Sequence, residues 1–211
     1  NSHSVDAAGL NHLYESQRNF TISSANGSGL YLTVPSAPQN VSGSGLNTNA
    51  TVTFSPPADN GGLDLASYQY SLDGGSTYIN ISNLADNGNG TFSFAVTGLT
   101  AGQTYSIKVA ATNALGRGAL ASLTLTAQVV DFGNIPNTQQ NAGPIYLATQ
   151  ASAGLPYTYV ASPSSVCTVS TNVVTLIATG TCSLTQNQAG DSTHLATVAY
   201  SSFQVLANPI V

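Results

Sequence analysis

The two cysteines, Cys167 and Cys182, have the most distinctive chemistry in this sequence. Such a pair can form a disulfide, remain as two buried thiols or supply half of a metal site. A structural zinc site needs about four ligands, and no cluster of histidine or acidic residues lies near either cysteine in the sequence. A disulfide is therefore favoured, while the other two alternatives stay open. If the disulfide forms, it implies an exported protein.

The sequence offers few residues that could act in general acid–base catalysis. The single glutamate is Glu15, and most of the aspartates occur in turn sequences, as Asp59, Asp73 and Asp86 do before Gly or Asn-Gly. A glycosidase needs two facing carboxylates, and no pattern nominates such a pair. The histidines are equally scattered. We therefore expect no enzymatic activity, no catalytic residue, no metal site and no cofactor.

The charge content excludes several classes of partner. Only 5% of the residues are charged, against about 25% in an average protein, and the basic residues are Arg18, Lys108 and Arg117 alone. Three cations cannot neutralise a row of phosphates, so neither nucleic acid nor a polybasic membrane patch is expected. No apolar run approaches the roughly 20 residues of a membrane span. Weak charge repulsion leaves close contact between copies of the chain permissible.

Tyrosine is abundant, with 10 copies. Tyrosine combined with Asn- and Ser-rich loops suits the binding of sugars or proteins, because the ring is rigid and amphipathic. Packing within the core and between strands accounts for most of these residues. Carbohydrate therefore remains one candidate ligand, with no particular tyrosine nominated as a contact.

The segment 1–33 differs from the rest of the chain. Its start has the apolar spacing of a short helix, and the stretch around SANGSG predicts a hairpin, because apolar residues alternate on both sides of turn-forming residues. An apolar strand left in water is costly and can template association. We expect this segment to act as an assembly arm, and the candidate contacts are Phe20, Ile22, Leu30 and Leu32.

From residue 34 to residue 127 the pattern becomes regular. Short alternating runs are separated by clusters of Gly, Pro, Asn and Asp about every 8 to 12 residues, which predicts an antiparallel β-sandwich. The predicted strands are 51–54, 67–72, 91–96, 104–111 and 122–127.

The segment 34–127 resembles a fibronectin type III domain. The likeness rests on PSAPQNV, TVTFSPP, SYQYSL, GLTAGQTYSIKVAATNALGRG and ASLTLT. Its most specific part is Leu99 followed by Ala101, Gly102 and Tyr105, which resembles the tyrosine corner of that family. The resemblance implies that the Tyr105 hydroxyl ties its strand to the preceding loop. Phe54 stands where the family usually has a core Trp, so the core should stay aromatic.

The segment 128–211 predicts a second sandwich. Over 128–207 it resembles the bacterial immunoglobulin-like repeats of long surface proteins, through VVDFGNIP, ASAGLPYTYVASPSSVCTVS, NVVTLIATGTCSLTQNQAGD and SFQVL. The resemblance implies that Cys167 and Cys182 lie on neighbouring strands and pair. The predicted strands are 129–132, 145–149, 157–160, 173–177, 182–186 and 202–206.

These features predict an all-β protein of two tandem immunoglobulin-like sandwiches with a short N-terminal segment. The resemblances imply a non-enzymatic structural or adhesive protein of the bacterial cell surface, whose partners are other copies of itself or other surface proteins. Within this class we favour a self-assembling filament subunit. The alternative is a carbohydrate-binding or spacer module of a larger secreted polysaccharide-degrading enzyme. The chain starts at Asn1 without a signal sequence, so any signal peptide is expected to lie outside it.

Overall fold

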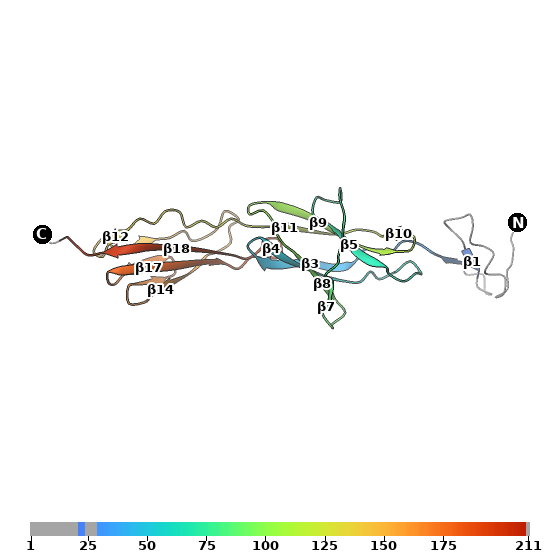
Figure 1. Ribbon diagram of the computed structural model, residues 1–211, viewed down its shortest axis with the longest axis horizontal. Helices are drawn as coiled ribbons and strands as arrows, with labels where there is room; N and C mark the ends of the chain where they lie inside the picture. Colours follow the sequence, from blue (N-terminus) through green and yellow to red (C-terminus); the bar gives the residue numbers. More distant parts are fainter. Residues whose placement is uncertain (1–20, 24–28, 210–211) are drawn as a thin grey trace.

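The computed structural model describes residues 21–23 and 29–209. Within these ranges the secondary structure consists of β-strands, and no helix is present. Figure 1 shows an elongated molecule in which two sandwiches follow one another along the long axis. The all-β prediction is confirmed, and the predicted N-terminal helix lies outside the described residues.

The first sandwich is built from two antiparallel sheets. One sheet has the order β3-β4-β8-β7, and the other has the order β10-β9-β5-β6, with β11 also paired to β9. The strands of the first sheet are β3 (Gln39–Leu46), β4 (Asn49–Ser55), β7 (Ala85–Asp86) and β8 (Phe92–Val96). Those of the second are β5 (Ser67–Ser71), β6 (Ile79–Asn80), β9 (Thr104–Asn113), β10 (Gly116–Arg117) and β11 (Ala121–Thr126).

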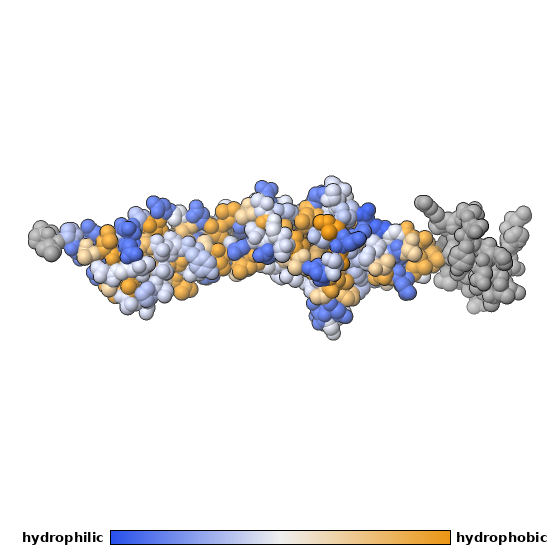
Figure 2. All heavy atoms as spheres, viewed as in Figure 1, coloured by the Kyte–Doolittle hydropathy of each residue, from blue (hydrophilic) through white to orange (hydrophobic). Residues whose placement is uncertain are grey.

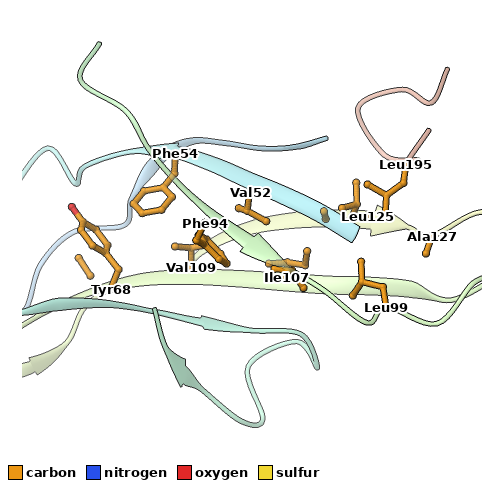
Figure 3. Packing of buried hydrophobic residues seen from close by; sticks show 13 residues of the cluster. Val52, Phe54, Tyr68, Phe94, Leu99, Ile107, Val109, Leu125, Ala127 and Leu195 are labelled. Carbon is orange, nitrogen blue, oxygen red and sulfur yellow. The ribbon is translucent and has the colours of Figure 1, made fainter. Parts of the chain in front are cut away.

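An aromatic core fills the space between these sheets (Figure 3). Phe54 is fully buried, as the resemblance implied, and its ring meets Tyr68 edge-on with the centroids 4.9 Å apart. β9 contributes Ile107 and Val109 by strict alternation, because successive side chains of a strand point to opposite faces. Between them, Lys108 faces outward and donates to Ser122 Oγ at 2.7 Å.

The sequence patterns located the five main strands of this sandwich but missed β3. That strand reads QNVSGSGL, which offers little apolar alternation. It forms because Gly43 lets Leu123 and Leu125 of β11 pack directly on its backbone, where an added Cβ would lie 3.0 Å from Leu123 Cδ2. A close approach of this kind depends on the opposite sheet and leaves no periodic signal.

The second sandwich has one four-stranded and one three-stranded sheet. Their orders are β12-β18-β17-β14 and β13-β16-β15. The strands are β12 (Thr138–Gln139), β13 (Ile145–Tyr146), β14 (Thr158–Ser162), β15 (Cys167–Ser170), β16 (Val173–Leu176), β17 (Gly180–Gln188) and β18 (Thr197–Leu206). The two sheets enclose a separate, smaller cluster around Val174, Leu184, Phe203 and Val205.

One predicted strand of this region is wrong. Residues 129–132 form no ladder, and Asp131 instead accepts the Gly133 N–H at 2.9 Å in a turn. Phe132 still packs against the second cluster. An alternating apolar run therefore marked a segment that lies over the core without pairing, which periodicity alone cannot separate from a strand.

The N-terminal hairpin is present as β1 (Thr21–Ser23) and β2 (Gly29–Tyr31), paired with Ile22 opposite Leu30. The two strands form a separate sheet in the described part of the chain, and Figure 1 shows β1 beyond the end of the first sandwich. Phe20 lies outside the described residues. From Thr33 onward the chain is tied to the first sandwich, since Thr33 N donates to Gly61 O at 2.9 Å.

Candidate functional site

Cys167 and Cys182 form a disulfide in the second sandwich. Cys167 lies on β15 and Cys182 on β17, and both are fully buried. These strands belong to different sheets, so the expectation that the cysteines occupy neighbouring strands is wrong. The bond joins the two sheets through the core, and it therefore fixes the sandwich more directly than a link within one sheet.

Tyr105 lies at the start of β9 and reaches back to the preceding loop. Its hydroxyl accepts the Thr100 N–H at 2.8 Å. Leu99, next to this contact, is buried in the first core, and its N–H donates to Thr48 O at 3.0 Å. Side chain and backbone thus hold the 97–103 loop against the sandwich from two sides.

Removing the Tyr105 hydroxyl, as Tyr105→Phe, is expected to lower the free energy of unfolding by about 0.5–1.5 kcal/mol, the usual net value of one hydrogen bond. The effect stays modest because Thr100 is exposed, so water can solvate its freed N–H. Urea denaturation of the full chain measures it. Tyr200→Phe is the control, since Tyr200 is 78% exposed; equal midpoints for the two variants would contradict the structural role of Tyr105.

The joint between the two sandwiches combines a buried apolar side chain with backbone and side-chain hydrogen bonds. We define it as the loop 189–196, between β17 and β18, together with the ends of the first sandwich that it contacts. Leu195 of this loop is fully buried, and it packs in the core of the first sandwich beside Leu125 and Ala127 (Figure 3). A residue of the second sandwich thus completes the core of the first.

Backbone hydrogen bonds fix the loop on both sides of Leu195. Leu195 N donates to Thr126 O at 2.9 Å, and Thr126 N donates to Thr193 O at 2.7 Å. On the other side, Asn47 N donates to Ala196 O at 2.8 Å, and Ala196 N donates to Gly45 O at 3.1 Å. The loop is therefore held between the ends of β11 and of the β3–β4 turn.

Asn47 adds a side-chain clamp to these contacts. Its φ of 56° lies in the left-handed region, which Asn tolerates better than most residues. Its Oδ1 accepts from Thr197 Oγ1 at 3.0 Å and from Val198 N at 3.1 Å. The turn of the first sandwich thereby caps the first residues of β18.

A buried pair of glutamines closes the centre of the joint. Gln128 Nε2 donates to Gln188 Oε1 and, at 2.8 Å, to Leu195 O. Gln188 Oε1 also accepts the Gly190 N–H at 3.0 Å. Buried amides that are paired in this way resist bending, because breaking either bond would leave a buried polar group without a partner.

Asp191 organises the tip of the loop. Its Oδ1 accepts from Thr193 N at 2.7 Å, from His194 N at 2.8 Å and from His194 Nδ1 at 2.9 Å. The hydrogen bond from the Thr193 N–H is the largest contribution that lowers the pKa of Asp191 to about 2, and the bond from His194 adds to it. Gly190 is needed beside it, since its φ is 73° and a Cβ would lie 2.5 Å from His194 O.

Acid is expected to loosen this loop. Because the pKa of Asp191 is lower in the folded chain than its ordinary 3.8, the carboxylate stabilises the fold above that pH, and the contribution is lost as the pH falls towards about 2. Urea midpoints measured across this window should fall less steeply for Asp191→Ala than for the unchanged chain. Asp64→Ala, at an exposed aspartate, serves as the control; parallel curves for all three would contradict the assignment.

Asp73 and Asp59 accept hydrogen bonds within their own turns. Asp73 accepts from Ser71 Oγ at 2.6 Å and from Thr77 Oγ1 at 2.7 Å, and the Ser71 bond is the main cause that lowers the pKa of Asp73. Asp59 accepts the Gly61 N–H at 2.8 Å. Across residues 21–23 and 29–209, no three His, Cys, Asp or Glu side chains gather as metal ligands would.

The described part of the chain also contains no helix of the length and hydropathy that crossing a bilayer requires.

The sequence did not nominate the residues of the joint. Leu195 is the single large apolar residue in the stretch AGDSTHLA, and Asn47 occurs in an ordinary turn sequence, NTN. The one available signal was that Leu195 stands alone where a loop should be polar. The structure brings Cys167 and Cys182 together and places Tyr105 beside the residue that follows Leu99. Of the candidate assembly residues, it pairs Ile22 with Leu30 in the N-terminal hairpin.

Comparison with known proteins gives one family. The family model of the fibronectin type III domain matches residues 36–128. No curated protein is significantly similar to the chain.

Three solved structures illustrate the structural likeness. One, described as FN3tt mut, has 21% identity, with 46% of this chain and 100% of that chain covered and a TM-score of 0.34. The fourth FNIII domain of a human protein has 24% identity, with 46% and 82% covered and a TM-score of 0.38. The FN5 domain of Drosophila Lar has 23% identity, with 46% and 100% covered and a TM-score of 0.33.

The family match covers the first sandwich, whose sheet orders, aromatic core and Tyr105 contact are described above. The resemblance of 128–207 to bacterial immunoglobulin-like repeats stays a prediction. Residues 36–128, which form this sandwich, are similar to the fibronectin type III family.

Proposed function

We propose that the chain is a rigid, non-enzymatic structural module of the bacterial cell surface. The observation that carries the proposal is the joint, in which Leu195 of one sandwich is buried in the core of the other. Domains within a chain move relative to one another by default unless their contact is apolar and extensive. A joint with a shared core and paired buried amides is suited to a spacer that must hold its length. A fibronectin type III domain fits a structural or adhesive role of this kind.

The proposed units are an arm over 1–33, a first domain over 34–127 and a second over 128–211. Two separate hydrophobic clusters support this division. Gln128 supports the boundary, because it follows the last buried residue of the first core and its side chain belongs to the joint. Among the residues whose burial the structure describes, Leu195 alone crosses from the second unit into the first cluster.

The disulfide supports a location outside the cytoplasm. Structural disulfides persist in oxidising compartments and are rare in the cytosol, and Cys167–Cys182 is fully buried as a structural bond should be. The weakly charged surface fits a protein that contacts other copies closely. Figure 2 shows hydrophilic and hydrophobic residues interspersed along the visible face.

Self-assembly through the N-terminal arm is the finer part of the proposal. β1 and β2 form a two-stranded sheet that is separate from the sandwich sheets of the described chain. A two-stranded hairpin is marginal by itself, and its free edges can pair with another chain. We expect the candidate contacts Phe20, Ile22, Leu30 and Leu32 to meet a second copy.

Deleting residues 1–33 is expected to abolish or greatly weaken oligomers while both sandwiches stay folded, because their cores are encoded downstream. Sedimentation and circular dichroism of the full and shortened chains measure the two effects. A second test variant replaces Ile22 and Leu30 by Thr within the full chain, which keeps strand propensity, removes apolar surface and should also weaken the oligomers. Identical monomeric sedimentation for all three proteins would contradict the assembly role, and loss of β structure on truncation would show that the arm belongs to its own domain.

A carbohydrate-binding or spacer module of a larger secreted polysaccharide-degrading enzyme is the second candidate. A rigid joint suits a spacer equally well, so the joint does not distinguish the two candidate functions. The gene sequence does, since a catalytic domain encoded in the same reading frame would favour the enzyme module.

A further inference from the structure

A half-open pocket of about 220 Å³ lies in the second sandwich. Its walls come from the segment 131–136, from β13 and the residues that follow it, from Tyr159 of β14 and from Gln186 of β17. An apolar cavity of about 150 Å³ accepts a benzene ring. The pocket therefore has room for one six-membered ring with substituents.

Gln186 is the unusual residue of this pocket. It follows Cys182 and Leu184 in the inward-facing row of β17, where an apolar side chain is expected, and it is only 1% exposed. Its Oε1 is buried and has no hydrogen-bond partner among the described residues. A buried acceptor without a partner costs about 1–3 kcal/mol, so a group that donates a hydrogen bond here would remove a penalty already present in the fold.

Aromatic rings form the apolar part of the walls. Phe132 and Tyr159 contact one another with their centroids 5.9 Å apart, and Tyr159 is held in place because its hydroxyl donates to Ala148 O at 2.8 Å. Tyr146 also lines the pocket and is 72% exposed, so most of its ring is available to a ligand. Rigid rings that need no reordering reduce the entropy lost on binding.

The charge of the lining selects the class of ligand. Asp131 is the single charged residue of the walls, and no Lys, Arg or His is among them. An anionic ligand would meet this carboxylate without a compensating cation, which makes its desolvation unfavourable. Asn134 and Asp131 offer further polar groups at the edge. The lining therefore disfavours an anionic ligand and fits one that donates hydrogen bonds and presents an apolar face to the rings.

The geometry points to a binding site for a neutral pyranose unit of a glycan. A pyranose presents C–H groups on one face, which can lie against Tyr146, and hydroxyl groups at its edge. One of these hydroxyls donates to Gln186 Oε1 when a rotation of the side-chain amide turns this buried atom toward the pocket. This site is independent of the joint and of the rigid-module proposal, and it would give the same module a means of attachment.

Titration of the full-length oxidised chain with glucose, galactose, mannose and N-acetylglucosamine, followed by two-dimensional amide NMR, tests the site. At least one sugar is expected to cause saturable shifts in the amide signals of residues 131–135, 145–148 and 186. Tyr146→Ala should weaken that affinity about threefold to tenfold through the lost ring contact. Gln186→Leu should weaken it about threefold to tenfold through the lost acceptor, while the fold is kept or stabilised.

Tyr200→Ala is the matched control, because Tyr200 is an equally exposed tyrosine of the second sandwich that does not line the pocket. Its affinity should equal that of the unchanged chain. Three results would overturn the assignment: no shift in the pocket with any sugar up to tens of millimolar, an affinity of both pocket variants equal to that of the unchanged chain, or, in a parallel titration with lysine amide, shifts caused by lysine amide and by none of the sugars. The last would indicate a cationic peptide ligand.

Discussion

Replacing both cysteines, as Cys167→Ala with Cys182→Ala, is expected to lower the free energy of unfolding of the second sandwich by about 3 kcal/mol, within a range of roughly 2–5. The bond closes a loop across a sequence separation of 15 residues, so it removes conformational freedom from the unfolded chain. It also links two sheets whose shared core is small. A stability loss of that size is a large share of the roughly 5–15 kcal/mol of an ordinary domain.

Urea denaturation of the full chain, followed by amide NMR signals from each sandwich, measures this loss. The signals of the first sandwich should keep their midpoint, and those of the second should shift to lower urea. Ser170→Ala with Ser183→Ala is the matched control, since these serines are exposed on the same two strands. If the cysteine variant unfolds like this control, the disulfide contributes nothing to the fold and the argument from loop closure is wrong.

Leu195→Ala is expected to destabilise the first sandwich by about 2–5 kcal/mol, although the residue belongs to the second. The truncated side chain leaves a cavity beside Leu125 and Ala127 and removes the apolar contact that spans the joint. The hydrogen bonds of the loop then hold the two sandwiches without a shared core. We therefore expect their unfolding transitions to separate and the joint to bend.

Denaturation with separate signals from each sandwich measures the uncoupling, and small-angle X-ray scattering measures the bending as a broader distribution of interatomic distances. Leu206→Ala is the control, because this leucine of β18 is 45% exposed. A Leu195→Ala chain that keeps both the transitions and the scattering profile of the control would show that the joint does not depend on the shared core. The rigid-module proposal would then lose its main support.

Local patterns in the sequence determined most of the first sandwich. Alternation along 104–111 predicted β9, because the two-residue period of a strand is set by backbone geometry alone. The spacing of Leu99 and Tyr105 predicted a contact that spans only a few residues, and the Thr100–Tyr105 bond lies within that reach. Contacts between residues that are close in the sequence can therefore be predicted from the sequence.

Tertiary structure decided the features that join distant segments. Asn47 meets Thr197 across a sequence separation of 150 residues, and Leu195 enters a core whose other buried residues lie 68 or more positions earlier, with Leu125 as a neighbour. Alternation placed Gln186 on the inner face of β17 but could not say that a pocket would form over it. Such contacts arise from the way the two folded sandwiches and their loops fit together. The sequence alone cannot predict them, because burial and hydrogen bonding at these positions depend on surfaces that exist only after the strands have paired.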